Sequence, residues 1–227
     1  MEISGFEKMT LTDYPGSVAA IVFTQGCNFK CPFCHNSDLI YFKSGVIDEN
    51  EVLDYLGKRK KMLDGVVITG GEPTMQKDLI GFLNKVKDLG LKVKLDTNGA
   101  KPEILQKIID LNLVDYIAMD IKSSQNNYSE VSGVKVDINK IRESISIIKK
   151  SKLDFEFRTT VVKNYHNYES LLEICEYVGK DVKYYLQNFE NSSRVLNSTL
   201  ESFSKDELLK MCAKINGKFP NVKVRGI

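Results

Sequence analysis

The chain has 227 residues, of which 42% are hydrophobic, so it is long enough to bury one substantial core. Its 32 Lys and Arg residues nearly balance its 30 Asp and Glu residues, which leaves a formal net charge of +2. This balance argues against nucleic acid or a membrane as the main partner. We expect a single domain over residues 1–227. No signal-peptide pattern or membrane-length apolar run is present, so we expect a cytoplasmic protein.

Segments with strand composition alternate with segments of helical period along the whole chain. In chain order, we predict a strand at 18–25, a helix at 48–63, a strand at 65–70, a helix at 77–89, a strand at 91–97, a helix at 102–112, a strand at 114–122, a helix at 137–150, a strand at 155–162, a helix at 167–179, a strand at 182–189, a helix at 204–217 and a tail strand at 221–226. Pro102 suits a first helical turn, because proline has no N–H to lose there.

This alternation predicts an α/β fold with a parallel sheet, because parallel neighbours need a crossover and a helix supplies it. The strand-then-helix units are fewer than the eight of a closed barrel. An open, partial (β/α)6 barrel and a doubly wound sheet therefore both fit the pattern. Either architecture places functional loops at the carboxyl ends of the strands.

Three of the five cysteines, Cys27, Cys31 and Cys34, lie within the stretch QGCNFKCPFCHN after the first predicted strand. An odd, clustered set of cysteines favours metal or redox chemistry over a disulfide framework. A structural zinc site uses four ligands, whereas a cubane iron–sulfur cluster can use three cysteines and leave one iron open. We therefore favour an iron–sulfur cluster over zinc.

The remaining cysteines and the two histidines are weaker candidates. Cys175 and Cys212 each lie among apolar residues of a predicted helix, which indicates buried core thiols. His166 is expected to be solvated in its loop. His35 follows Cys34 directly, and either a position beside the cluster or a local backbone hydrogen bond would explain it.

Further polar or glycine-rich motifs end the next three strands. TGGEPT offers exposed backbone N–H groups and a carboxylate acceptor to an amino acid moiety, although an ordinary turn would look the same. LDTNG and AMDIK place acids at neighbouring strand ends, where they can bind a cation, ribose hydroxyls or a carboxylate. Helix capping by Asp96 or Asn98 and solvation of Lys122 are the simpler alternatives.

The strand at 155–162 places Glu156, Arg158 and Thr160 on one face, because side chains alternate along a strand. Arg158 on an inward face would need a carboxylate partner. A salt bridge with Glu156 or with a neighbouring strand, and contact with a ligand, are equally compatible with the sequence.

The CxxxCxxC spacing, with Phe33 before the last cysteine, resembles the signature of radical S-adenosylmethionine (SAM) enzymes. The resemblance implies a partial (β/α)6 barrel of radical SAM type, with SAM bound to the open iron of a [4Fe-4S] cluster. TGGEPT is similar to the family's GGEP motif, and DTNG and D-x-K are similar to SAM-pocket motifs of the glycyl-radical activating branch, where a monovalent cation can lie beside the SAM carboxylate. The cluster ligands implied are Cys27, Cys31 and Cys34, and the SAM-pocket residues are Phe33, Thr69, Gly70, Gly71, Glu72, Asp96, Thr97, Asp120, Lys122 and Arg158.

Within that branch, the segments TLTDYPG, FTQGCNFKCPFCHNSDLI and DTNG resemble the activating proteins of anaerobic ribonucleoside-triphosphate reductase, and no inserted ferredoxin-like cysteine set follows Asn36. This resemblance implies an oxidoreductase that cleaves SAM reductively and generates a glycyl radical on that reductase, with flavodoxin or ferredoxin as electron donor. A radical SAM enzyme acting on another glycyl-radical protein, a peptide or a small molecule is the alternative. A non-catalytic zinc or electron-transfer module fits the strand-end motifs least well.

Overall fold

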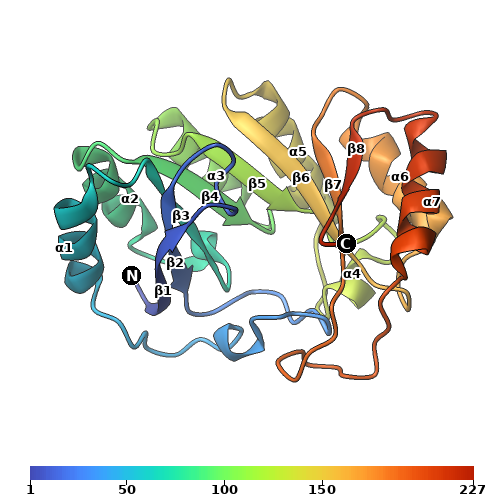
Figure 1. Ribbon diagram of the computed structural model, residues 1–227, viewed down its shortest axis with the longest axis horizontal. Helices are drawn as coiled ribbons and strands as arrows, with labels where there is room; N and C mark the ends of the chain where they lie inside the picture. The colour runs from blue at the N-terminus through green and yellow to red at the C-terminus, as the bar shows by residue number, and fades with distance from the viewer. The chain divides into compact units, whose positions relative to one another are not determined.

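The structure, a computed structural model, describes all of residues 1–227, and their contacts form two compact units. Unit 1 comprises Met1–Asn28, Asp38–Ala118 and Lys140–Asp154, and unit 2 comprises Phe29–Ser37, Met119–Asn139 and Phe155–Ile227. Eight strands are hydrogen-bonded in sequence order, β1 to β8, and alternate with helices (Figure 1). The α/β prediction is confirmed. The sequential order decides against a doubly wound sheet, in which the strand order reverses at a switch point.

Unit 1 contains β1 (Ile3–Thr10), β2 (Ala19–Thr24), β3 (Gly65–Gly70), β4 (Lys92–Thr97) and the first residues of β5 (Tyr116–Asp120). β2, β3 and β4 pair in parallel, as predicted. β1 pairs antiparallel with β2 and was not predicted. Its sequence, ISGFEKMT, shows no clear alternation of apolar and polar residues, because most of its side chains are only partly buried at the sheet edge.

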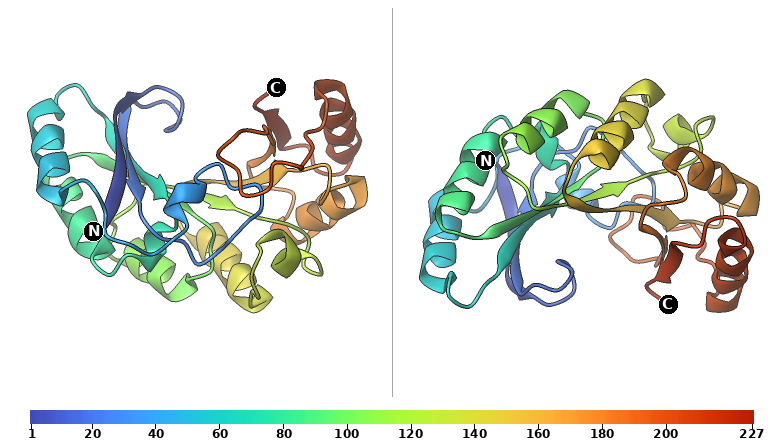
Figure 2. Two further views of the ribbon diagram at one scale, coloured as in Figure 1. Left: turned by 90° about the horizontal axis from the view of Figure 1, so that it is seen from below. Right: turned by 90° about the horizontal axis from the view of Figure 1, so that it is seen from above.

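The helices of unit 1 are α1 (Glu49–Arg59), α2 (Leu79–Asp88), α3 (Pro102–Asp110) and most of α5 (Ile138–Lys150), with 3-10 turns η1 (Ser37–Leu39, shared with unit 2) and η2 (Pro73–Met75). Figure 2 shows α1, α2 and α3 on one side of β2, β3 and β4. α1 ends at Arg59, earlier than the predicted 48–63, and Lys60 is its C-cap. No helix in the protein is both long and apolar enough to cross a bilayer.

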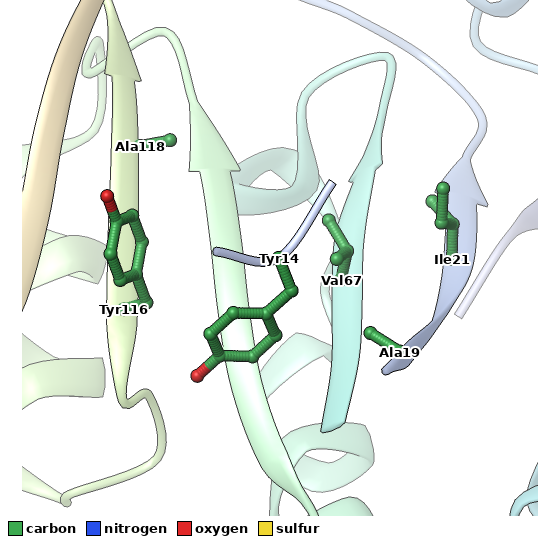
Figure 3. Close-up of a cluster of buried hydrophobic side chains, with 6 residues drawn as sticks. All are labelled: Tyr14, Ala19, Ile21, Val67, Tyr116 and Ala118. Carbon is green, nitrogen blue, oxygen red and sulfur yellow. The ribbon is translucent and has the colours of Figure 1, made fainter. Parts of the chain in front are cut away.

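Figure 3 shows a buried apolar cluster formed by side chains of β2, β3, β5 and the loop before β2. It contains Tyr14, Ala19, Ile21, Val67, Tyr116 and Ala118. The Tyr14 and Tyr116 rings lie 6.0 Å apart, and burial raises the pKa of Tyr14, with Asp115 and Asp154 adding to the shift. Because both faces of β2 and β3 are covered, these strands are continuous apolar runs in the sequence.

Unit 2 contains the end of β5, β6 (Asp154–Val161), β7 (Tyr184–Asn188), β8 (Val222–Arg225), α4 (Tyr128–Val131), α6 (Tyr168–Val178) and α7 (Lys205–Asn216). β6, β7 and β8 pair in parallel, which confirms the predicted tail strand. Asn167 and Ser204 begin α6 and α7 with capping boxes. Cys175 and Cys212 are buried on these helices, as predicted.

Candidate functional site

In unit 1, the loops after β2 and β3 are joined by main-chain hydrogen bonds. The Gly71 N–H donates to Thr24 O and the Glu72 N–H donates to Gly26 O, each at 2.8 Å. A Cβ atom on Gly71 would lie only 2.2 Å from Gly26 O, so a side chain cannot fit there. The paired glycines of TGGEPT therefore allow this loop to pack directly on the residues that lead into Cys27.

The Glu72 carboxylate holds the loop after β3 against the end of β4. It accepts hydrogen bonds from Thr74 N–H at 3.1 Å, Thr97 Oγ1 at 2.8 Å and Asn98 N–H at 2.7 Å, and from Thr74 Oγ1 at 2.5 Å. Burial raises the pKa of Glu72, and these hydrogen bonds oppose the shift. Four donors match the acceptor capacity of a carboxylate, so the geometry gives Glu72 the role of organising both loops.

Asn98 connects the end of β4 to the cysteine loop within unit 1. Its Nδ2 lies 3.9 Å from Cys27 Sγ and 2.8 Å from Asn28 Oδ1. Asn98 does not cap α3, whose N-cap is Lys101. The capping alternative for Asn98 is therefore wrong, and its amide faces the first cysteine instead.

Asp96 forms an ion pair with Lys94, which the sequence analysis did not single out. Both residues lie on β4, two positions apart and so on the same face. Lys94 is buried, with 2% of its surface exposed. The signal for this pair was a lysine inside an apolar strand with an acid two residues later, because a buried cation needs a partner. Asp96 does not cap α3 either.

In unit 2, Cys31 and Cys34 form a turn in which the Cys34 N–H donates to Cys31 O at 3.0 Å. Burial raises the pKa of Cys31 to about 11 and also raises that of Cys34. Phe33 is buried, with its ring 6.4 Å from that of Tyr165. Phe33, which lies between Cys31 and Cys34 in the sequence, thus packs against another part of unit 2.

The segment after α4 anchors this turn, and sequence reasoning missed it. The Lys30 N–H donates to Ser132 O at 2.9 Å. Gly133 has a φ of +68° and lies so near Lys30 that a Cβ would sit 2.2 Å from Lys30 O. The only sequence signal was an isolated glycine in EVSGV, which marks a turn without showing what it contacts.

Asp120, Lys122 and Arg158 form a charged group in unit 2, at the end of β5 and on the adjacent part of β6. The Arg158 Nε donates to Asp120 Oδ1 at 2.8 Å, and Lys122 Nζ lies 3.3 Å from Asp120 Oδ2. Burial alone would raise the pKa of Asp120, but Arg158 and Lys122 lower it to about 2. The carboxylate is therefore ionised, and Lys122 is ion-paired rather than merely solvated.

The salt bridge of Arg158 with Asp120 on the neighbouring strand β5 confirms the neighbouring-strand alternative. Arg225 on β8 binds both oxygens of Glu156 at 2.8 Å, and its guanidinium stacks 3.5 Å from the centre of the Tyr185 ring. Glu156 is 1% exposed. A bidentate arginine suits a buried carboxylate because it satisfies both oxygens.

His166 is buried and hydrogen-bonded, so the expectation of a solvated loop histidine is wrong. The Val162 N–H donates to His166 Nδ1 at 3.1 Å, and His166 Nε2 lies 3.0 Å from Lys122 O. Since Nδ1 accepts, we assign the hydrogen to Nε2, which then donates to Lys122 O. Burial lowers the pKa of His166. This histidine holds the backbone of Lys122.

A polar hollow of about 360 Å³ lies at the ends of β6 and β7 in unit 2. It is lined by His35, Thr160, Gln187, Asn188 and Glu190. His35 packs against Phe189, with ring centres 5.6 Å apart. Asn188, one of these lining residues, has a buried Oδ1 without a hydrogen-bond partner.

The three clustered cysteines suit an iron–sulfur cluster by their chemistry. None of the five cysteines forms a disulfide, and soft thiolate sulfur is the usual ligand of such clusters. Across residues 1–227, no group of three or more His, Cys, Asp and Glu side chains is arranged to hold a single metal ion. Ligation by Cys27, Cys31 and Cys34 therefore stays a prediction from their spacing and donor chemistry.

Comparison with known proteins gives a family match over most of the chain. The model of the radical SAM superfamily matches residues 21–178. A protein of Methanocaldococcus jannaschii named as a glycyl-radical enzyme activating enzyme is 36% identical over 196 residues, covering 83% of this chain and 80% of the relative. The pyruvate formate-lyase-activating enzyme of Clostridium pasteurianum is 28% identical over 91% of this chain and 98% of the relative.

Solved structures share the fold at low sequence identity. SuiB of Streptococcus suis, bound to its precursor peptide SuiA, superposes with a TM-score of 0.69 at 17% identity. The match covers 91% of this chain but 48% of SuiB, so the chain spans about half the length of that protein. At this identity, the similarity concerns the fold alone.

Proposed function

Because the chain belongs to the radical SAM superfamily and, within it, to the glycyl-radical enzyme activating enzymes, we propose that it generates a glycyl radical on a partner enzyme. Radical SAM enzymes use a [4Fe-4S] cluster and SAM. A bound, reduced cluster would supply the single electron for cleavage of SAM into methionine and a 5'-deoxyadenosyl radical. That radical would take a hydrogen atom from a glycine Cα of the partner, giving 5'-deoxyadenosine and the glycyl radical.

We assign the cluster to Cys27, Cys31 and Cys34. The main support is the packing of unit 1, in which the TGGEPT and DTNG loops are hydrogen-bonded to the residues around Cys27. Structural loops need no such connection to a cysteine motif, whereas a site for a cluster and its substrate does. A single domain over residues 1–227 is part of the same proposal.

For SAM, each charged end needs a group of opposite charge. Because the Gly71 N–H already donates to Thr24 O, we propose that Thr69, Gly70 and Gly71 offer main-chain carbonyl oxygens to the SAM amino group. Lys122 and Arg158 provide the cations that a carboxylate requires. Asp96, Thr97 and Asp120 stay candidates for SAM or for a monovalent cation. Glu72 and Phe33 support the site by ordering its loops and packing beside the cysteines.

The polar hollow of unit 2 is our candidate for the nucleoside end of SAM. Thr160 follows Arg158 on the same face of β6, and Gln187 is its register partner on β7. Amide side chains can both donate to and accept from a purine edge. The volume of about 360 Å³ falls within the usual range of ligand pockets.

The protein partner that we propose is anaerobic ribonucleoside-triphosphate reductase, with flavodoxin or ferredoxin as electron donor and the cytoplasm as the compartment. This choice depends on the segments TLTDYPG, FTQGCNFKCPFCHNSDLI and DTNG, which resemble that subgroup. Pyruvate formate-lyase is the competing partner, because an activating enzyme of that class matches nearly the whole chain.

The decisive experiment starts with anaerobic reconstitution of the full chain. We expect about four irons per chain, since a cubane cluster holds four, and 5'-deoxyadenosine after reduction in the presence of SAM. Incubation with each candidate partner should then give a glycyl EPR doublet with the reductase. A doublet only with pyruvate formate-lyase would make that enzyme the partner instead. A reconstituted chain that holds no iron or does not cleave SAM would exclude the proposed enzymatic activity.

A further inference from the structure

We propose that Asn98 is a positioning residue that donates a hydrogen bond to the Cys27 thiolate and thereby raises the reduction potential of the cluster. The inference rests on the proposed function, because it requires Cys27 to be a cluster ligand. Its basis is the 3.9 Å approach of Asn98 Nδ2 to Cys27 Sγ within unit 1.

The orientation of the Asn98 amide follows from its other contacts. Its Oδ1 accepts a hydrogen bond from the Ala100 N–H at 3.0 Å. Its Nδ2 lies 2.8 Å from Asn28 Oδ1, which can only accept. A flipped amide would place oxygen against oxygen at Asn28 and nitrogen against an N–H at Ala100. The NH₂ group therefore faces Cys27, with one hydrogen directed to Asn28 and the other available to the sulfur.

The backbone of Asn98 is fixed independently of this side chain. The Asn98 N–H donates to Glu72 Oε2 at 2.7 Å, and Thr97 donates to the other carboxylate oxygen at 2.8 Å. Asn98 itself is 5% exposed. Since water has little access to the amide, the protein rather than solvent supplies this donor to Cys27.

A hydrogen bond to a ligating sulfur changes the potential of an iron–sulfur cluster. Reduction adds negative charge to the cluster and its sulfur ligands, so an N–H donor stabilises the reduced form more than the oxidised form. SAM cleavage requires the reduced form. Asn98 would thus make the electron-donating state easier to reach, through Cys27 and without touching SAM.

The test is an EPR-monitored redox titration of the reconstituted full chain without SAM. Asn98→Ala removes the donor without adding charge. We expect its ratio of reduced to oxidised cluster at a fixed potential to fall about tenfold, which is about 59 mV for a one-electron couple. Asn98→Asp keeps the size of the side chain and the acceptor for Ala100, and should lower the potential further because it adds negative charge. If Asn98→Ala does not take up iron, the midpoint potential of Asn98→Asp tests the inference instead.

The matched control is Asn216→Ala, because Asn216 Nδ2 lies 3.6 Å from Cys212 Sγ, a cysteine outside the cluster motif. The control should titrate like the wild type. Equal midpoints in the wild type and both Asn98 variants, or an equal shift in the control, would overturn the inference while leaving the proposed function intact. A wild-type chain without a cluster would overturn both.

Discussion

Arg158 Nε donates a hydrogen bond to Asp120 Oδ1 at 2.8 Å and so joins the end of β5 to β6 in unit 2. Lys122 lies 3.3 Å from the other oxygen of the same carboxylate. Both cations thus contact the same carboxylate. The carboxylate of SAM, as proposed, would add a second negative charge to this group.

Replacing Asp120 by Asn should destabilise the protein in a pH-dependent way. The pKa of Asp120 falls from its ordinary 3.8 to about 2 in the folded state. The ionised carboxylate therefore contributes about 2 kcal/mol above pH 4, and this contribution is lost as the pH falls from about 4 to about 2. Urea unfolding at pH 7 and pH 3 should show a wild-type advantage that shrinks on acidification. The exposed Asp54→Asn is the control.

His166 should make the protein less stable below neutral pH. Burial lowers its pKa, so the unfolded chain binds a proton before the folded chain does, and stability falls as the pH drops through and below 6.5. Between pH 7.5 and 5.5, the wild type should lose about 1 kcal/mol more than His166→Gln. Urea unfolding at both pH values measures this difference. Parallel losses in the two proteins would contradict the neutral Nε2–H assignment.

Glu72→Gln should destabilise unit 1 by about 2–4 kcal/mol, because an amide NH₂ would then face N–H and O–H donors that are buried. The variant keeps the volume of the side chain, so packing alone predicts little change. Urea unfolding of the apoprotein measures the effect. Glu173→Gln, on the exposed side of α6, is the control and should stay within about 0.5 kcal/mol of the wild type. Similar free energies of unfolding for Glu72→Gln and Glu173→Gln would contradict the organising role of Glu72.

Gly133→Ala should disturb the turn that carries Cys31 and Cys34. The Cβ would overlap Lys30 O, and φ is +68°, so we expect a loss of at least about 1 kcal/mol and reduced iron uptake. Gly81→Ala is the matched control. Gly81 lies in α2 with open space around its Cα, so this variant should be neutral or stabilising by about 0.5–1 kcal/mol. Unfolding curves and iron content distinguish the two.

Cys31→Ala should abolish cluster assembly, because a cubane held by three cysteines cannot lose a ligand without replacement. Cys175→Ala should keep its iron, since Cys175 is a buried thiol of α6. Iron content and the visible absorption of anaerobically reconstituted protein measure both. Equal iron loss in the two variants would refute the ligand assignment.

The sequence by itself determined the order of the elements and the motifs at their ends. Hydrophobic periodicity and composition are local properties, so the strands from β2 to β8 and the principal helices could be predicted within a few residues. The cysteine spacing and the motifs TGGEPT and DTNG could be recognised for the same reason, because they too are local in the sequence. The edge strand β1 and the short helix α4 were not, because partial burial and small size weaken the local pattern.

Only the tertiary structure decided which side chains meet. Glu156 pairs with Arg225, 69 positions away in the chain. Pairing of β8 with β7 brings that distant arginine near, and its long side chain extends over the Tyr185 ring to the buried carboxylate, whereas Arg158 pairs with Asp120 on β5. Likewise, Asn98 reaches Cys27 across 71 positions. Such contacts depend on strand register and loop packing, which arise when the whole chain folds and leave no periodic signal in the sequence.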